Sequence, residues 1–229
     1  MDINQLLLFI AAGLLLNLTP GPDVLYIVTH ALRSGARAGV VAALGITAGC
    51  FVHIFAAALG VSALMAASST AFTVLKWMGT VYLVYVGASM LLARPFSPGK
   101  DALIATNAIA VSDRITGATG RGSIFFKGFW TNVLNPKVAL FFLAFVPQFI
   151  APGVDNKPLA FLLLGLLFNF NGLWIGVGWA LAAAWLARRA GVVQTGMHWL
   201  ERAAGILFIG FGLKLAFSDH PATDALPGK

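Results

Sequence analysis

Two short stretches place helix-breaking residues beside residues that can carry charge, inside otherwise apolar surroundings. Residues 17–23 read Asn-Leu-Thr-Pro-Gly-Pro-Asp, and residues 132–137 read Asn-Val-Leu-Asn-Pro-Lys. Proline lacks an amide hydrogen and clashes with the preceding turn, at a cost of about 3 kcal/mol in a helix interior. Each break frees backbone carbonyls, which must find partners because lipid offers none. We therefore expect both breaks to face protein or a watery cavity.

These two stretches carry the chemistry of a site for a small zwitterion. Half-helix ends present N–H groups to an anion and carbonyl groups to a cation. A charge at the bilayer centre costs at least about 2.5–3.5 kcal/mol. Asp23 is therefore neutral, paired with Lys137 or titrated during transport. The long side chain of Lys137 can also extend to the membrane interface. The sequence leaves these alternatives open. The predicted substrate-binding or hinge residues are Asn17, Pro20, Gly21, Pro22, Asp23, Asn132, Asn135, Pro136 and Lys137.

Three further polar residues interrupt apolar runs and are, with Asp23, candidates for proton coupling or substrate contact. His53 is either a proton relay or a hydrogen-bonded core residue. Asn169 and Asn171 either contact the substrate or tie helices together. The single cysteine, Cys50, excludes an intrachain disulfide and a Cys-rich metal site.

The elements that must position these residues are transmembrane helices. Of the 229 residues, 59% are hydrophobic and 10% are charged, against about 25% charged residues in soluble domains. Such a chain is a polytopic membrane protein. The net charge of +7 comes from basic residues scattered in short loops, so it reflects membrane topology and not nucleic-acid binding.

Six apolar stretches give an all-α fold that spans the membrane six times. Because the helices separate as three, a polar linker and three more, the halves enter the membrane in opposite senses, as inverted repeats do. Within a single transmembrane domain we expect repeat one at about 4–92, a cytoplasmic linker at about 93–122, repeat two at about 123–217 and a disordered tail at 218–229. The six stretches are roughly 4–32, 38–66, 71–92, 123–149, 157–187 and 197–217, and prolines break the first and fourth.

Basic residues set the orientation. Arg33 and Arg37 follow the first stretch, and Arg188 and Arg189 follow the fifth. The positive-inside rule makes these loops and the linker cytoplasmic, so both termini are periplasmic in a bacterial inner membrane.

The Gly45-x-x-x-Gly49 motif allows close helix contact, either within the bundle or in a homodimer.

The motifs resemble those of the LysE/RhtB family of amino-acid exporters. They are Pro20-Gly21-Pro22-Asp23, Gly45-x-x-x-Gly49, Gly79-x-x-Tyr82-Leu83 and Phe126-x-Gly128-x-x-x-Asn132-x-x-Asn135-Pro136-Lys137. The resemblance covers most of residues 4–217. It implies efflux of amino acids of the lysine, homoserine, threonine or leucine type, or of close derivatives, by exchange with protons.

The predicted function is secondary active export of amino acids by alternating access around a midplane site. The expected partners are the substrate, the lipid bilayer and protons, with neither a cofactor nor nucleic acid. The alternative is a cation or metal-ion exporter, which is expected to use several membrane acids, histidines or thiols. An enzyme is not expected, because the sequence contains neither a His-Glu-x-x-His motif nor a second intramembrane aspartate to partner Asp23.

Overall fold

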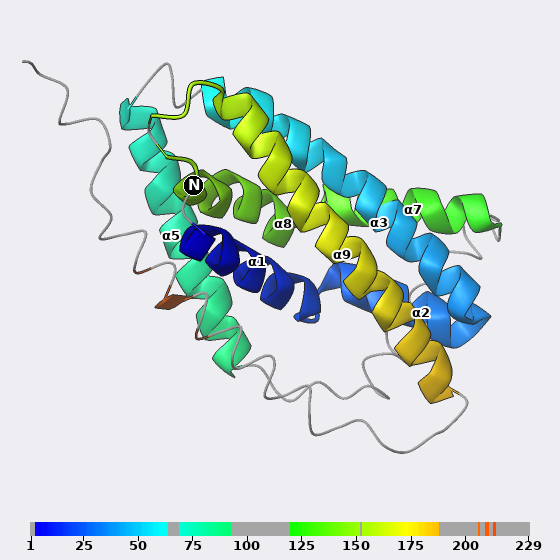
Figure 1. Ribbon diagram of the computed structural model, residues 1–229. Coiled ribbons are helices and arrows are strands. Elements are labelled where there is room, and N and C mark those ends of the chain that lie inside the picture. The colour runs from blue at the N-terminus through cyan, green and yellow to red at the C-terminus, as the bar shows by residue number, and fades with distance from the viewer. Residues whose placement is uncertain are drawn as a thin grey trace, which may run out of the picture.

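The computed structural model describes residues 3–63, 69–92, 120–151 and 153–187, together with residues 206, 209, 210 and 213. All regular secondary structure in these residues is helical, as predicted (Figure 1). The α-helices are α1 (Ile3–Leu18), α2 (Pro22–Ser34), α3 (Ala36–Ala56), α5 (Ser69–Leu92), α7 (Arg121–Val133), α8 (Pro136–Leu140) and α9 (Lys157–Ala187). The π-helix η1 (Ala57–Val61) extends α3, and the π-helix η2 (Phe141–Phe145) and the 3₁₀-helix η3 (Val146–Phe149) extend α8.

Two uninterrupted helices are long and apolar enough to cross a membrane, Ala36–Val61 and Lys157–Ala187. Two more candidate spans are bent pairs: α1 meets α2 at 51°, and α7 meets the helix Pro136–Phe149 at 47°. By length and composition, the described residues therefore contain two candidate spans, or up to four if each bent pair is one span. The predicted interruption of the first and fourth stretches is confirmed, because each bend lies at its proline motif.

Several predictions fall on other parts of the chain. Most of the linker at about 93–122, the tail at 218–229 and most of the sixth stretch at 197–217 lie outside the described residues. The six-span count and the inverted repeats stay predictions for that reason.

Helix α3 packs against α2, α7 and α9. Its two motif glycines allow the closest approach. A Cβ atom at Gly45 would overlap the carbonyl oxygen of Phe125, and one at Gly49 would overlap that of Phe129. Among the described contacts, the Gly45-x-x-x-Gly49 motif therefore serves the internal packing of α3 on α7. This packing fixes the position of Asn132 along α3, next to Gly49.

Two buried clusters lie on opposite sides of the breaks. The first is rich in phenylalanine and joins α1 to η2, η3 and α9, with Phe9 and Phe168 both packed on Phe141. The second joins α2, α3 and α9 through small residues such as Ala31, Ala42 and Ala180. In lipid such packing stabilises helix pairs through van der Waals contact and not through release of water. The polar residues of the breaks lie between these apolar clusters.

Candidate functional site

The first break exposes carbonyls that a distant lysine satisfies. In a continuous helix the carbonyl of Leu16 would accept from the amide of residue 20, but Pro20 has none. The Nζ atom of Lys137 donates to the Leu16 carbonyl at 2.8 Å and to the Thr19 carbonyl at 3.1 Å. An ammonium group from α8 thus binds the C-terminal end of α1, where the helix dipole favours positive charge.

The other motif residues shape the start of α2. Gly21 is its N-cap residue and has extended backbone, and Pro22 is the first helical position. Proline suits this position because the first amide of a helix lacks an intrahelical partner. Pro20 lies between the two helices, so the two prolines end α1 and restart the chain in a new direction.

The second break obeys the same rule with different partners. The carbonyl four residues before Pro136 belongs to Asn132, and Nε2 of His53 lies 2.9 Å from it. A carbonyl only accepts hydrogen bonds, so Nε2 carries the hydrogen and donates. Asn135 caps α8, and its side chain accepts from the Lys137 amide at 3.0 Å. Of the two interpretations of His53, its contact is that of a hydrogen-bonded core residue.

A side-chain hydrogen bond joins the two breaks directly. Nδ2 of Asn132, at the end of α7, donates to Oδ2 of Asp23, in the first turn of α2, at 2.8 Å. Lys137 and His53 also interact electrostatically with the Asp23 carboxylate. The hydrogen bonds of the Lys137 ammonium nevertheless go to carbonyls and not to Asp23. The α1–α2 pair and the α7–α8 pair are therefore joined by side chains: Asn132 of α7 bonds Asp23 of α2, and Lys137 of α8 bonds the end of α1.

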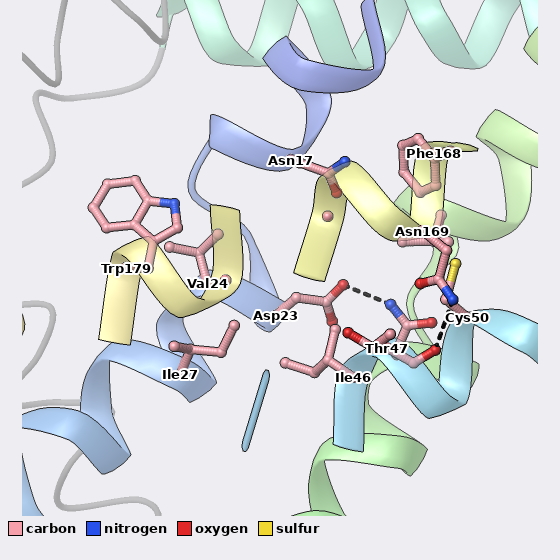
Figure 2. A pocket seen from close by; sticks show the side chains of 14 residues that line it. Asn17, Asp23, Val24, Ile27, Ile46, Thr47, Cys50, Phe168, Asn169 and Trp179 are labelled. Atoms are coloured by element: carbon pink, nitrogen blue, oxygen red, sulfur yellow. Dashed lines mark hydrogen bonds between the residues drawn. The ribbon is translucent and has the colours of Figure 1, made fainter. Parts of the chain in front are cut away.

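A cavity of about 40 Å³ lies beside this bond. Figure 2 shows Asp23 in the middle of the lining residues, with Trp179, Val24 and Ile27 on one side and Phe168, Asn169 and Cys50 on the other. A second cavity, of about 30 Å³, also reaches Asp23 and contains the lysine. Each volume exceeds the ~10–15 Å³ needed for a water but falls far below the ~300 Å³ of small ligand pockets. The second cavity is lined by Leu16, Asn17, Thr19, Gly21, Asp23, Val24, Asn135, Lys137 and Val138.

Four buried polar atoms of the larger cavity have no hydrogen-bond partner. Asp23 and Asn132 each leave an Oδ1 atom unpaired. Two donors are also unpaired, Nδ2 of Asn17 and Nε1 of Trp179. An unsatisfied buried polar group costs about 1–3 kcal/mol. The cavity thus presents two acceptors and two donors to whatever enters it.

The asparagines of α9 separate into two positions. Nδ2 of Asn169 donates to the Thr47 carbonyl at 3.2 Å, and Asn169 also lines the larger cavity. It therefore ties α9 to α3 and faces the candidate site at once. Asn171 lies two residues further along, about 200° around the helix, and is not among the lining residues of either cavity.

Sequence reasoning missed Trp179, Phe168 and the cavity-facing role of Gly172 and Gly176. A spacing signal existed, because Asn169, Gly172, Gly176 and Trp179 recur at intervals of three and four residues. That spacing places them on one helix face. The signal is weak because α9 is apolar around its whole circumference, and the nearby Trp174 and Trp185 are exposed.

Comparison with known families identifies the family. The family model of the LysE type translocators matches residues 14–219. The chain belongs to the LysE type translocator family. The matched range contains both proline breaks and every residue of the candidate site. A family of translocators indicates a membrane transporter and not an enzyme.

Curated relatives of this translocator match it over nearly their whole length. It is 31% identical over 218 residues to an uncharacterized membrane protein of Vibrio cholerae serotype O1, covering 94% of the chain and 98% of the relative. It is 26% identical over 208 residues to a leucine efflux protein of Salmonella typhimurium, covering 91% of the chain and 92% of that relative. No solved structure matches it.

The alternative of a metal-ion exporter gains no cluster from the described residues. Within 3–63, 69–92, 120–151 and 153–187, no three His, Cys, Asp or Glu side chains lie close enough together to hold a metal ion.

Proposed function

We propose that this translocator exports a neutral, apolar amino acid from the cytoplasm, and that the substrate binds at the junction of the two broken helices. The observation that carries the proposal is the set of unpaired donors and acceptors in the larger cavity. Asp23 and Asn132 offer oxygen atoms to an α-ammonium group. Asn17 and Trp179 offer N–H groups to an α-carboxylate. A zwitterion would satisfy all four atoms.

The remaining lining suits an aliphatic side chain. The apolar lining residues of the cavity include Val24, Ile27, Ile46, Val138 and Phe168. Asp23 is the one acidic residue among the lining residues, so a second ammonium, as in lysine, would lack a carboxylate partner. The name of the leucine efflux relative agrees with this inference.

Binding requires the cavity to expand, which fits alternating access. The cavity of about 40 Å³ is far smaller than the ~300 Å³ of small ligand pockets. The breaks in α1–α2 and α7–α8 are the expected hinges, because proline removes the hydrogen bonds that keep a helix straight. The phenylalanine-rich cluster would close the path on the α1 side. We assign the two bent pairs to inverted repeats within a six-span fold.

Basic residues at one end of the bundle support a proposed orientation. Arg37 and Arg121 line one surface groove, and the exposed Arg33 lies in the last turn of α2, four residues before Arg37. We assign this end to the cytoplasm of a bacterial inner membrane and the chain termini to the periplasm. Export would then be driven by protons entering against the substrate, with Asp23 as the proposed proton-binding carboxylate.

The test is uptake of labelled amino acids into inside-out vesicles, with and without a proton gradient. We expect leucine uptake that an ionophore abolishes. The Asp23→Asn variant should lose about 30-fold or more, because truncating a buried, hydrogen-bonded charge costs about 2–5 kcal/mol. Asp155→Asn is the matched control, since Asp155 is exposed in a loop.

Two outcomes would overturn the proposal. Normal uptake by the Asp23→Asn variant would remove Asp23 from the site. Transport of a divalent cation without transport of any amino acid would favour the cation exporter instead.

A further inference from the structure

The lysine contact at the first break has the geometry of an occupied cation site. Its oxygen ligands are the Leu16 carbonyl, whose helical donor Pro20 cannot supply, and the Thr19 carbonyl just beyond the end of α1. Carbonyls at the end of a half-helix are the groups that coordinate monovalent cations in transporters with broken helices. The negative end of the α1 dipole adds to their attraction for positive charge.

The surroundings of this position are also those of a cation site. The Asp23 carboxylate lines the same cavity of about 30 Å³ and interacts electrostatically with Lys137. Asn135 lines it as well, while its side-chain oxygen fixes the backbone from which the lysine extends. The cavity lies between the two breaks and is large enough for a small ion or a water. These are oxygen ligands, which hard cations prefer.

We propose that the Leu16 and Thr19 carbonyls, with Asp23, form a monovalent-cation site that the chain fills with its own Lys137 ammonium. The translocator therefore needs no inorganic cation, such as Na⁺, to hold the first break. Lys137 is a positioning residue: it fixes the end of α1 relative to α8 and acts on the substrate site through Asp23. This inference concerns the break itself and does not depend on which substrate is exported.

Emptying the site should create a requirement for an external cation. In the Lys137→Ala variant the two carbonyls lose their donor and Asp23 loses the nearby positive charge while it keeps its hydrogen bond from Asn132. The space of the lysine side chain then opens to small ions. Na⁺ or ethylammonium should then bind in place of the lysine. A purely structural role, as a tie between helices, predicts loss of stability without any response to these ions. The two roles therefore differ in a measurable way.

The experiment measures the melting temperature of purified, full-length protein in detergent, in choline chloride, NaCl or ethylammonium chloride of equal ionic strength. Wild type should melt at the same temperature in all three. Lys137→Ala should melt lower in choline and rise by about 5 °C at saturating Na⁺ or ethylammonium. The control is Lys157→Ala, which removes a lysine from the start of α9 and should not respond to the ions.

Several results would overturn the inference. A folded Lys137→Ala variant that ignores both ions would do so, as would a wild-type protein stabilised by Na⁺. If Lys137→Ala aggregates, Lys137→Gln decides, because it keeps an uncharged donor and should still gain stability from Na⁺. Aggregation of both variants in every salt also counts against the site. The melting measurement uses no substrate, so its failure is distinct from failure of the proposed transport function.

Discussion

The two helix breaks follow one rule and use different partners. In each, a basic side chain from another helix hydrogen-bonds the carbonyl four residues before a proline: Lys137 at Leu16 and His53 at Asn132. The bends are similar, at 51° and 47°. The first break depends on a flexible side chain that bears the charge, whereas the second depends on an imidazole ring of fixed direction.

The breaks also differ in how far each supports itself. Asn135 caps α8 with its own side chain, but the N-cap of α2 is Gly21, which makes no side-chain bond. The first break is therefore held mainly from outside, by Lys137, and the second is held partly by its own residues. We infer that the α1–α2 break moves more easily during transport. Variants of the partner residues can test this asymmetry.

The largest effect is expected at the first break. Lys137→Ala should lower the free energy of unfolding by about 3–5 kcal/mol in a cation-free buffer, because it leaves two carbonyls without their donor and removes the positive charge near the half-buried Asp23, which keeps its hydrogen bond from Asn132. Thermal unfolding in detergent measures this, and export should fall with it while membrane insertion persists. A loss smaller than that of His53→Leu would reverse the inferred asymmetry.

A smaller effect is expected at the second break. His53→Leu should cost about 1–2 kcal/mol, since the Asn132 carbonyl keeps its turn bond from the Asn135 amide at 2.9 Å. His53→Gln retains an N–H donor near the position of Nε2 and should restore most of the stability. The same pair distinguishes the two roles of His53: if the glutamine variant folds normally but loses proton-driven export, His53 is a proton relay.

The cap of α8 comes next. Asn135→Ala should cost about 1 kcal/mol, the usual effect of losing an N-cap side chain, and should also lower export because Asn135 lines the lysine cavity. Asn156→Ala is the matched control: its side chain accepts from the Leu159 amide at 3.0 Å at the exposed start of α9. If both variants lose the same stability but only Asn135→Ala loses export, Asn135 contributes to the site beyond its role as a helix cap. If Asn135→Ala and Asn156→Ala export equally well, Asn135 is not part of the site.

The smallest effect is expected on α9. Asn169→Ala should lower both stability and export, because Asn169 bonds the Thr47 carbonyl and lines the larger cavity. Asn171→Ala should change the melting temperature by less than about 2 °C and leave leucine export unchanged, since Asn171 faces away from both cavities. A strong transport defect in Asn171→Ala would mean that the cavity opens toward that face.

The sequence by itself determined the membrane class, the helical fold, the family and the positions of both breaks. These depend on local properties, namely an apolar run, a missing proline amide and the identity of the residues beside it. Candidate site residues such as Asn17, Asp23 and Asn132 could be selected in the same way, because polar groups in apolar helices are costly unless they have partners.

The tertiary structure alone decided the partners. Asp23 and Asn132, which form a hydrogen bond, are 109 positions apart in the sequence, and Lys137 and Leu16 are 121 positions apart. No periodicity reveals such contacts, because they depend on how bent helices pack and on which rotamer a long side chain adopts. The same holds for Trp179, which helical spacing places on a face with Asn169 but which only the packing of α9 brings to the cavity. The sequence identified the polar groups that need hydrogen-bond partners, and the tertiary structure determined which residues are those partners.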